Sequence, residues 1–151
     1  MIIGIDPGQT GAIAFYDRGK VAALIDMPVM ARTHGKGQQV DPYTLATLIL
    51  EHGGQFGGAV LEQVASRPLQ SSQSGFNFGE SVGIIKGVLG ALQIPVRFVT
   101  PQRWKKAAGL IGKDKDASRA LAIQLHPEVS DQLTRKKDQG RAEAILIARF
   151  G

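Results

Sequence analysis

The sequence predicts a mixed α/β domain in which helices cover both faces of a five-stranded sheet. Three observations predict this fold. Three strand-like segments open the chain, strand-like and helix-like segments alternate after them, and glycine, proline or polar stretches separate the segments. This order is typical of a sheet whose later strands are connected by packed helices. The chain has 151 residues and no repeat or linker, so we expect a single domain over residues 1–151.

The opening strands are predicted at Ile2–Asp6, Gly11–Tyr16 and Lys20–Met27. The first is an apolar, β-branched run, which is typical of a strand buried inside a sheet. Pro7 and Gly8 then turn the chain sharply, and a polar hairpin turn separates the second strand from the third. Residues 30–39 show no periodicity and contain two glycines, so they are predicted to form an exposed, mobile basic loop.

The remaining elements are predicted from capping residues and apolar periodicity. Asp41 and Pro42 are typical of a helix start, and Gly53 and Gly54 of its end. Residues 66–74 are polar and predicted to be flexible. The other predicted segments are the strands Ala59–Val64 and Val96–Val99 and the helices Phe76–Leu92, Pro101–Leu110, Asp116–Leu125 and Gly140–Phe150.

The helix predicted at Phe76–Leu92 carries two stripes of residues. Its apolar stripe should face the core and consists of Phe78, Val82, Ile85, Leu89 and Leu92. Its second stripe consists of Gly79, Gly83 and Gly87. Because each glycine inside a helix costs about 1 kcal/mol relative to alanine, the glycine stripe suggests that another backbone packs closely there. That backbone could belong to this chain or to a second subunit.

The composition sets broad limits on function. No apolar run approaches the roughly 20 residues of a membrane span, and the chain opens directly with a strand, so we expect no targeting peptide. There is no cysteine, which excludes disulfides and thiolate metal sites and fits a cytoplasmic protein. The formal net charge of +5 weakly favours an anionic partner.

Two carboxylates stand at the ends of strands that should be central in the sheet. Asp6 ends the first strand, and Glu62 follows an apolar run. A buried carboxylate is costly without a cation or hydrogen-bond donors. Asp6 could also be an ordinary turn residue that bonds the backbone near Gly8. If the two strands are neighbours, the two carboxylates converge and need a cation between them.

Asp138 and Glu143 bracket the start of the last predicted helix. Two residues five positions apart in a helix do not share a face, so Asp138 and Glu143 can converge only if Asp138 lies just before the helix. Four carboxylates without cysteine make an oxygen-rich site suited to Mg²⁺ or Mn²⁺. Glu143 could otherwise be a surface helix residue.

Several stretches of the sequence resemble RuvC-type Holliday-junction resolvases, in order and over essentially the whole chain. They are IGIDPGQTG at 3–11, LEQ at 61–63, FNFG at 76–79, WKK at 104–106 and KDQGRAEA at 137–144. The likeness is greatest to the short phage and organelle-type branch, which implies a bacterial or phage-infected cell. It implies a ribonuclease H-like fold, a homodimer, and cleavage of DNA phosphodiesters by two Mg²⁺ ions per active site, which Mn²⁺ can replace.

Carried over residue by residue, the resemblance implies that Asp6, Glu62, Asp138 and Glu143 are the catalytic, metal-binding carboxylates. The chain departs from the family in two ways. Cellular members place the last two acidic groups about one helical turn apart, and here the separation is longer. Gln139 stands where many relatives are expected to carry histidine.

Basic residues are grouped in segments that should flank this site, as phosphate contacts would require. The lysines at 136 and 137 are also placed to assist the chemistry or to contact the DNA backbone. Phe76 is expected at or before the start of its helix, where the resemblance implies that an aromatic residue stacks on an unpaired base at the junction crossover. The DNA-binding residues expected are Phe76, Arg67, Arg103, Lys105, Lys106, Lys113, Lys136 and Lys137.

The sequence therefore predicts a metal-dependent endonuclease that resolves four-way DNA junctions by paired nicks and leaves 5′-phosphate ends. The same chemistry on flaps and forks is a close alternative. A non-catalytic DNA-binding module is a second, although four candidate carboxylates argue against it. A phosphate-binding ATPase domain built around Gly4–Gly11 would need a second phosphate loop and a chain about twice as long, so no nucleotide cofactor is expected.

Overall fold

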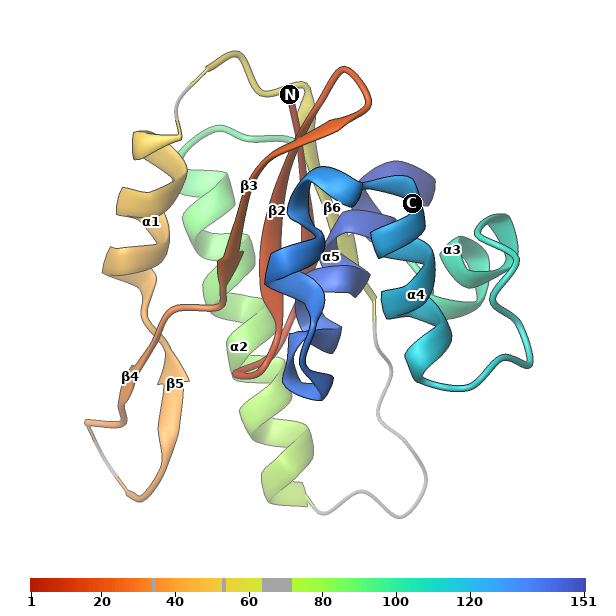
Figure 1. Cartoon of the computed structure of the whole chain (residues 1–151). Helices are drawn as coiled ribbons and strands as arrows, with labels where there is room; N and C mark the ends of the chain where they lie inside the picture. Colours follow the sequence, from red (N-terminus) through yellow and green to blue (C-terminus); the bar gives the residue numbers. More distant parts are fainter. Residues whose placement is uncertain (34, 53, 64–71) are drawn as a thin grey trace.

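The computed structural model describes residues 1–33, 35–52, 54–63 and 72–151 (Figure 1). Its centre is a five-stranded sheet in the order β3-β2-β1-β6-β7. The strands are β1 (Ile2–Asp6), β2 (Ala12–Asp17), β3 (Lys20–Asp26), β6 (Gly58–Glu62) and β7 (Val96–Val99). The predicted five-stranded mixed sheet is confirmed, and each predicted strand agrees with the structure to within two residues.

The central strand β1 is antiparallel to β2 and parallel to β6. Ile5 pairs with Leu61 in the parallel register, so the carboxyl ends of β1 and β6 lie next to each other. β7 continues the parallel part of the sheet, with Glu62 opposite Val99. The predicted adjacency of the first strand and the Glu62 strand is therefore confirmed.

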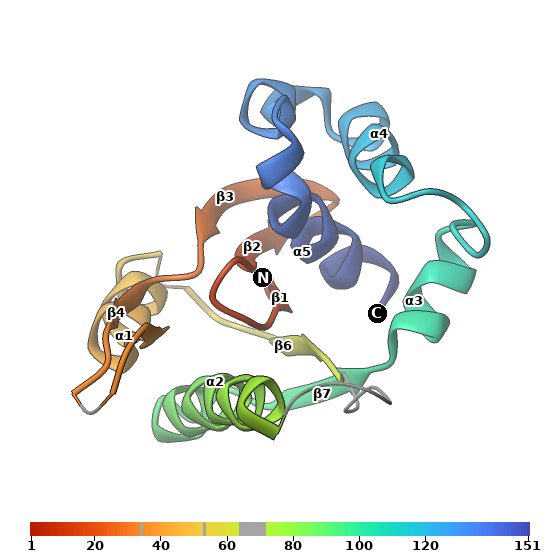
Figure 2. The ribbon, with the colours of Figure 1, turned by 90° about the horizontal axis from the view of Figure 1, so that it is seen from below.

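Helices pack on both faces of the sheet (Figure 2). One face is covered by α1 (Pro42–Glu51) and α2 (Ser72–Ala91), and the other by α5 (Gln139–Phe150), with α4 (Asp116–Leu125) packed against α5. The short helix α3 (Pro101–Ala107) follows β7, and the 3₁₀ helices η1 (Pro127–Leu133) and η2 (Lys136–Asp138) connect α4 to α5. Among the described residues, no helix combines the length and the apolar character of a membrane span.

Side chains of β1 alternate between the two faces, as in any strand. Ile3 and Ile5 lie in the core under α1 and α2, whereas Ile2 packs in the core under α5. Asp6 has the same parity as Ile2 and therefore belongs to the α5 face. Glu62 lies two residues after Val60 in the same strand, and Val60 also packs in the core under α5. Both strand-end carboxylates are therefore on one face of the sheet.

The predicted loop at residues 30–39 is wrong in part. β4 (Val29–Ala31) and β5 (Gln38–Val40) form a two-stranded antiparallel hairpin, which projects beside α1 and α2 (Figure 1). Arg32 extends from this hairpin and lies 2.7 Å from Glu80 of α2. This ion pair and the β4–β5 pairing stabilise the hairpin, although its sequence shows no periodicity.

The helix predicted from Phe76 begins earlier, at Ser72, so Ser72–Ser74 are helical and not a flexible loop. The rest of the polar segment predicted to be flexible, residues 66–71, lies outside the described residues. Ile85 and Leu89 are buried as predicted, but Phe78 is only half-buried and is not part of the core.

The glycine stripe of α2 faces solvent. Gly79, Gly83 and Gly87 are exposed, and a methyl group added at any of them would meet nothing within 4 Å in the described chain. The explanation that another backbone of this chain packs there is therefore wrong for the described residues. The alternative of a second subunit remains a prediction.

Candidate active site

Asp6 and Glu62 lie side by side at the carboxyl ends of the parallel strands β1 and β6. Glu62 is 6% exposed and Asp6 keeps partial exposure to solvent. Two acidic groups at neighbouring strand ends repel each other unless a cation or donors compensate. The pattern of apolar strands ending in a carboxylate has thus placed the two acids on one face of the sheet.

Helix α5 crosses directly over β1 because the contact consists of small residues. Gly4 lies against Ala144 and Ala148, and a methyl group at Gly4 would overlap the Ala144 carbonyl oxygen. Nearer the site, a methyl group at Gly140 would lie 2.7 Å from the Thr10 carbonyl oxygen and 3.2 Å from Asp6 Oδ2. This close approach brings Glu143, one turn after Gly140, to the Asp6 end of β1.

The electrostatics of Asp6 reflect this convergence. Burial raises the pKa of the Asp6 carboxyl well above its ordinary value. The charges of Glu143 and then Glu62 raise this pKa further, whereas Lys105 lowers it. Asp6, Glu62 and Glu143 therefore share one electrostatic environment, and its excess of negative charge favours binding of a cation.

Glu62 is held by a hydrogen bond from a distant part of the sequence. The indole Nε1 of Trp104 donates to Glu62 Oε1 at 2.7 Å, and this bond is buried. Trp104 lies on α3, which begins directly after β7 at the same edge of the sheet. The bond satisfies part of a buried carboxylate that would otherwise be costly.

Glu143 contacts a cation and an amide. Lys105 Nζ lies 3.7 Å from Glu143 Oε1, and Gln139 Nε2 donates to the same oxygen at 2.9 Å. Lys105 also lies over the ring of Trp104, 5.1 Å from its centroid. The site thus combines three carboxylates with a lysine that partly offsets their charge.

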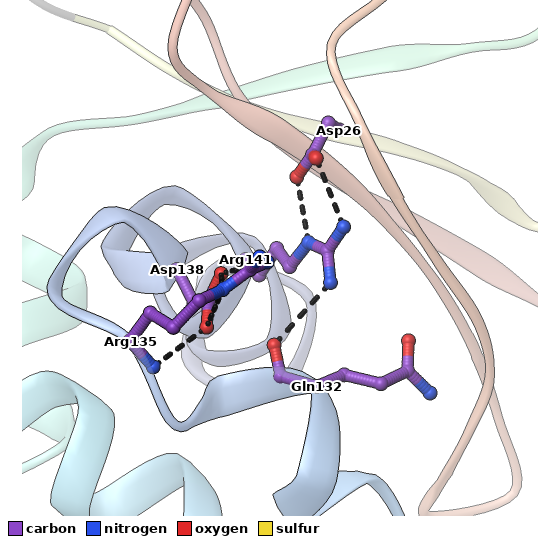
Figure 3. Close-up of polar contacts among 5 residues, drawn as sticks. All are labelled: Asp26, Gln132, Arg135, Asp138 and Arg141. Atoms are coloured by element: carbon purple, nitrogen blue, oxygen red, sulfur yellow. Dashed lines mark hydrogen bonds and ion pairs between the residues drawn. The ribbon is translucent and has the colours of Figure 1, made fainter.

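Asp138 lies just before α5, as its proposed convergence with Glu143 required, but its carboxylate points to Arg135 (Figure 3). Arg135 donates to Asp138 Oδ2 from its backbone N at 2.8 Å and to Oδ1 from its guanidinium Nη2, also at 2.8 Å. These hydrogen bonds hold the pKa of the Asp138 carboxyl below its ordinary value. The nearby Arg141 pairs with Asp26 and with the Gln132 carbonyl oxygen.

The structure therefore brings Asp6, Glu62 and Glu143 together and pairs Asp138 with Arg135. Within the described residues, no three acidic or histidine side chains are close enough to form a ready-made metal site. The chemistry of these side chains nevertheless suits a divalent cation, because their carboxylate oxygens are the ligands that such ions prefer. A cation would also stabilise the ionised form of Asp6, which burial and the neighbouring carboxylates disfavour.

Most of the predicted DNA-binding side chains are exposed to solvent. Lys105 is the exception, since its side chain is 35% exposed and paired with Glu143. Lys137 and Asp138 line a hollow of about 280 Å³ beside the turn between β1 and β2. Arg67 lies outside the described residues. The exposed basic residues are Arg103, Lys106, Lys113, Lys136 and Lys137.

Two phenylalanines lie on the part of α2 nearest the site. Phe76 is 67% exposed, as base stacking would require. The spacing of Phe78 predicts a core position, but its side chain lines a hollow of about 310 Å³ together with Gly8, Gln9 and Asn77. No sequence signal marks this position, because Phe78 continues the apolar stripe of the helix.

Sequence reasoning also missed three contacts of the carboxylates. The Trp104–Glu62 bond spans 42 positions and has no local pattern. The spacing of Arg135 and Asp138 at the start of a helix could have suggested their pairing, since a side chain three residues into a turn often bonds back. The Lys105–Glu143 pair becomes evident only when α3 and α5 are placed on the same face.

Comparisons with known proteins support the resemblance. The chain matches no protein-family model. Over 71 residues it is 45% identical to the chloroplastic Holliday junction resolvase MOC1 of Chlamydomonas reinhardtii, a stretch that covers 46% of this chain and 8% of that protein.

Solved structures of RuvC show the same fold. T. thermophilus RuvC in complex with a Holliday junction substrate superposes with a TM-score of 0.64 at 11% identity, covering 97% of this chain and 89% of that one. A second structure of Thermus thermophilus RuvC gives a TM-score of 0.56 at 13% identity, with coverage of 99% and 93%. The predicted ribonuclease H-like fold is confirmed. The prediction of a cytoplasmic location is not confirmed, since the relative is named as chloroplastic.

Proposed function

We propose that this chain is a structure-selective DNA endonuclease that resolves four-way junctions by paired nicks. The observation that carries the proposal is the pair Asp6 and Glu62 at adjacent parallel strand ends, faced by Glu143 from α5 on a RuvC fold. A relative named as a Holliday junction resolvase, 45% identical over 71 residues, supports the choice of substrate.

The proposed reaction depends on Mg²⁺, or Mn²⁺ in its place, with two ions per site. Such ions supply an activated water for attack on the phosphodiester and offset the charge that develops on it. The chain's own part is to hold the ions with Asp6, Glu62 and Glu143, and to present Lys105 beside them as a fixed positive charge. Asp138, the fourth candidate, supports the start of α5 through Arg135.

The DNA would be held by the exposed cations around this end of the sheet. Arg103 and Lys106 lie on α3 beside Glu62, and Lys136 and Lys137 lie on η2 beside Asp138. Such contacts position the phosphate backbone without reading sequence. Phe76 is placed to stack on a base exposed at the branch point, where one stacking contact is worth about 1–3 kcal/mol.

Paired nicks in two opposing strands require two sites, which a homodimer would supply. The exposed glycines of α2 offer a surface that a second copy could approach closely. A pair of sites held at a fixed distance would favour a four-way junction over a linear duplex.

The first test is cleavage of a synthetic four-way junction and of a linear duplex, with Mg²⁺, Mn²⁺ or a chelator. We expect symmetric, metal-dependent nicks in the junction alone, lost in Asp6→Asn while junction binding persists, because only the metal chemistry is removed. Asp131→Asn is the matched control, because this carboxylate is exposed in η1 and is not among the charges that shift the pKa of Asp6.

Other outcomes would correct the proposal in different ways. Cuts at flaps and forks as well would identify a broader branched-DNA nuclease. Binding without cleavage under any metal would leave a DNA-binding module on a nuclease fold. Unfolding of Asp6→Asn would show that Asp6 has a structural role.

A further inference from the structure

Trp104 is fully buried, yet its indole N–H makes a hydrogen bond at the site. Its ring lies in the core under α5, in the same cluster of buried side chains as Leu110 and Leu133. Its Nε1 donates to Glu62 Oε1 at 2.7 Å. A phenylalanine would fill most of the same space without this donor, so the indole contributes one group that packing does not require.

The approach of Trp104 to Glu62 follows from the sheet register. Glu62 pairs with Val99 at the end of β7, and the chain turns into α3 at the next residue. Thr100 caps α3 by accepting from the backbone N of Arg103, which fixes the first turn at this edge of the sheet. The indole is thereby held beside the carboxylate by two rigid elements.

A hydrogen bond to one carboxylate oxygen restricts the rotation of the side chain that bears it. Buried partners of metal-binding carboxylates commonly act in this way, orienting the ligand before the metal arrives. Lys105, the next residue of α3, lies near Glu143. Consecutive residues of one short helix therefore contact two of the three clustered carboxylates.

We propose that Trp104 is a positioning residue, whose indole N–H fixes Glu62 so that its carboxylate faces a divalent cation at Asp6. The inference rests on the proposed function only in taking the Asp6–Glu62 cluster as a metal site. It does not depend on which DNA structure is cleaved.

The first experiment compares Trp104→Phe with the wild-type chain across Mg²⁺ concentrations. We expect the half-saturating Mg²⁺ concentration for junction cleavage to rise by about tenfold or more, the usual effect of losing such a partner. The maximal rate should largely recover at high Mg²⁺, and junction binding without metal should be unchanged. Leu133→Val is the matched control, because it loosens the same core without touching Glu62. An unchanged Mg²⁺ dependence in Trp104→Phe would overturn the inference.

The second experiment needs neither a stable variant nor cleavage. Trp104 is the single tryptophan of the chain, so its indole gives one ¹⁵N–¹H resonance. Titration of the wild-type chain with Mg²⁺ alone should shift this resonance saturably, and Glu62→Ala should move its starting position and abolish the response. If the resonance does not shift with Mg²⁺ while the chain cleaves junctions, the inference about Trp104 is overturned and the proposed nuclease function is not. A saturable response without cleavage would support the inference and overturn the proposed nuclease.

Discussion

Asp138 and Glu143 illustrate how two similar acids acquire different environments from their neighbours. Asp138 is 2% exposed but fully engaged by Arg135, which compensates its charge and lowers its pKa. Glu143 accepts a hydrogen bond from the neutral amide of Gln139 and lies 3.7 Å from the charged Lys105, and its charge raises the pKa of Asp6. The carboxylate with the weaker compensation is the one that gains most from a cation.

This difference predicts that the two residues respond differently to removal of charge. We expect Glu143→Gln to lower the rate of junction cleavage at saturating Mg²⁺ by about 100-fold or more, because it removes a proposed metal ligand. Asp138→Asn should lower this rate by less than about tenfold, which is below the effect of about 10- to 100-fold that is usual when a ligand loses its supporting partner. Single-turnover rates with equal amounts of bound junction are the measurement. If Asp138→Asn is as inactive as Glu143→Gln, Asp138 belongs among the metal ligands.

The residues that could be predicted from the sequence are those whose position follows from a strand pattern. Asp6 and Glu62 end apolar runs, so their placement at neighbouring strand ends needed only the strand order. The partners of the carboxylates could not be predicted in this way. Trp104 lies 42 positions from Glu62, and Lys105 lies 38 from Glu143, so only the packing of α3 brings either pair together.

At the level of elements, the position of α5 on β1 determines the geometry of the site. A helix can approach a strand this closely only where side chains are absent or small, which is why Gly4 meets Ala144 and Gly140 meets the turn after β1. Any added bulk at Gly140 would lift the start of α5 away from Asp6. The distance between Glu143 and the strand-end carboxylates would then increase.

Gly140→Ala tests this dependence. We expect a loss of about 1–3 kcal/mol in the free energy of unfolding, typical of an overpacked contact, and a fall in cleavage rate that persists at temperatures where the variant is fully folded. Gly90→Ala in α2 is the control, since its methyl group would meet nothing within 4 Å, and we expect no loss of stability or of activity there. Chemical denaturation and cleavage at low temperature separate the two effects. Normal cleavage by a folded Gly140→Ala would contradict the proposed role of this contact.

Helix α1 provides a pH-dependent element remote from the site. Asp41 caps it by accepting from Tyr43 N at 3.0 Å and from Thr44 N at 3.1 Å, and its hydrogen bonds with Thr44 lower the pKa of its carboxyl. Because the folded pKa is depressed, this stabilisation is fully present above the unfolded value of about 3.9 and is lost as the pH falls through the folded value.

We therefore expect Asp41→Ala to unfold more easily than wild type at pH 7, with a difference that shrinks as the pH falls below about 4. Asp41→Asn keeps an acceptor oxygen but cannot ionise, so it isolates the contribution of the charge. Thermal unfolding midpoints across this pH range are the measurement. A difference between Asp41→Ala and wild type that stays constant with pH would show that ionisation of Asp41 does not contribute.

Elements with strong periodicity or clear caps were predictable, and short ones were not. The segment Asp116–Leu125 was predicted with the bounds that the structure shows, and α1 begins at its predicted cap. β4 and β5 were missed because three residues are too few for alternation to be recognised. The same limit explains why η1 and η2 were not anticipated.

At the scale of the whole molecule, α2 presents an unusual surface. Gly79, Gly83 and Gly87 recur along one exposed side of a helix whose opposite side is buried in the core. Solvent exposure alone would favour residues that form helices better, since each glycine costs about 1 kcal/mol relative to alanine. A second copy that packs its backbone against this surface would account for the cost.

Gly83→Leu should therefore convert a dimer into monomers, because a leucine side chain would separate two closely packed helices. Ala120→Leu changes another exposed small residue, on α4, and should leave the assembly unchanged. Sedimentation velocity gives the mass of each variant, and cleavage of a junction in supercoiled DNA shows whether the two nicks remain paired. We expect the Gly83→Leu monomer to nick single strands without coupling, since its metal site is intact but alone. A Gly83→Leu chain that still sediments with the wild-type mass and still makes paired nicks would show that the two active sites are joined through another surface.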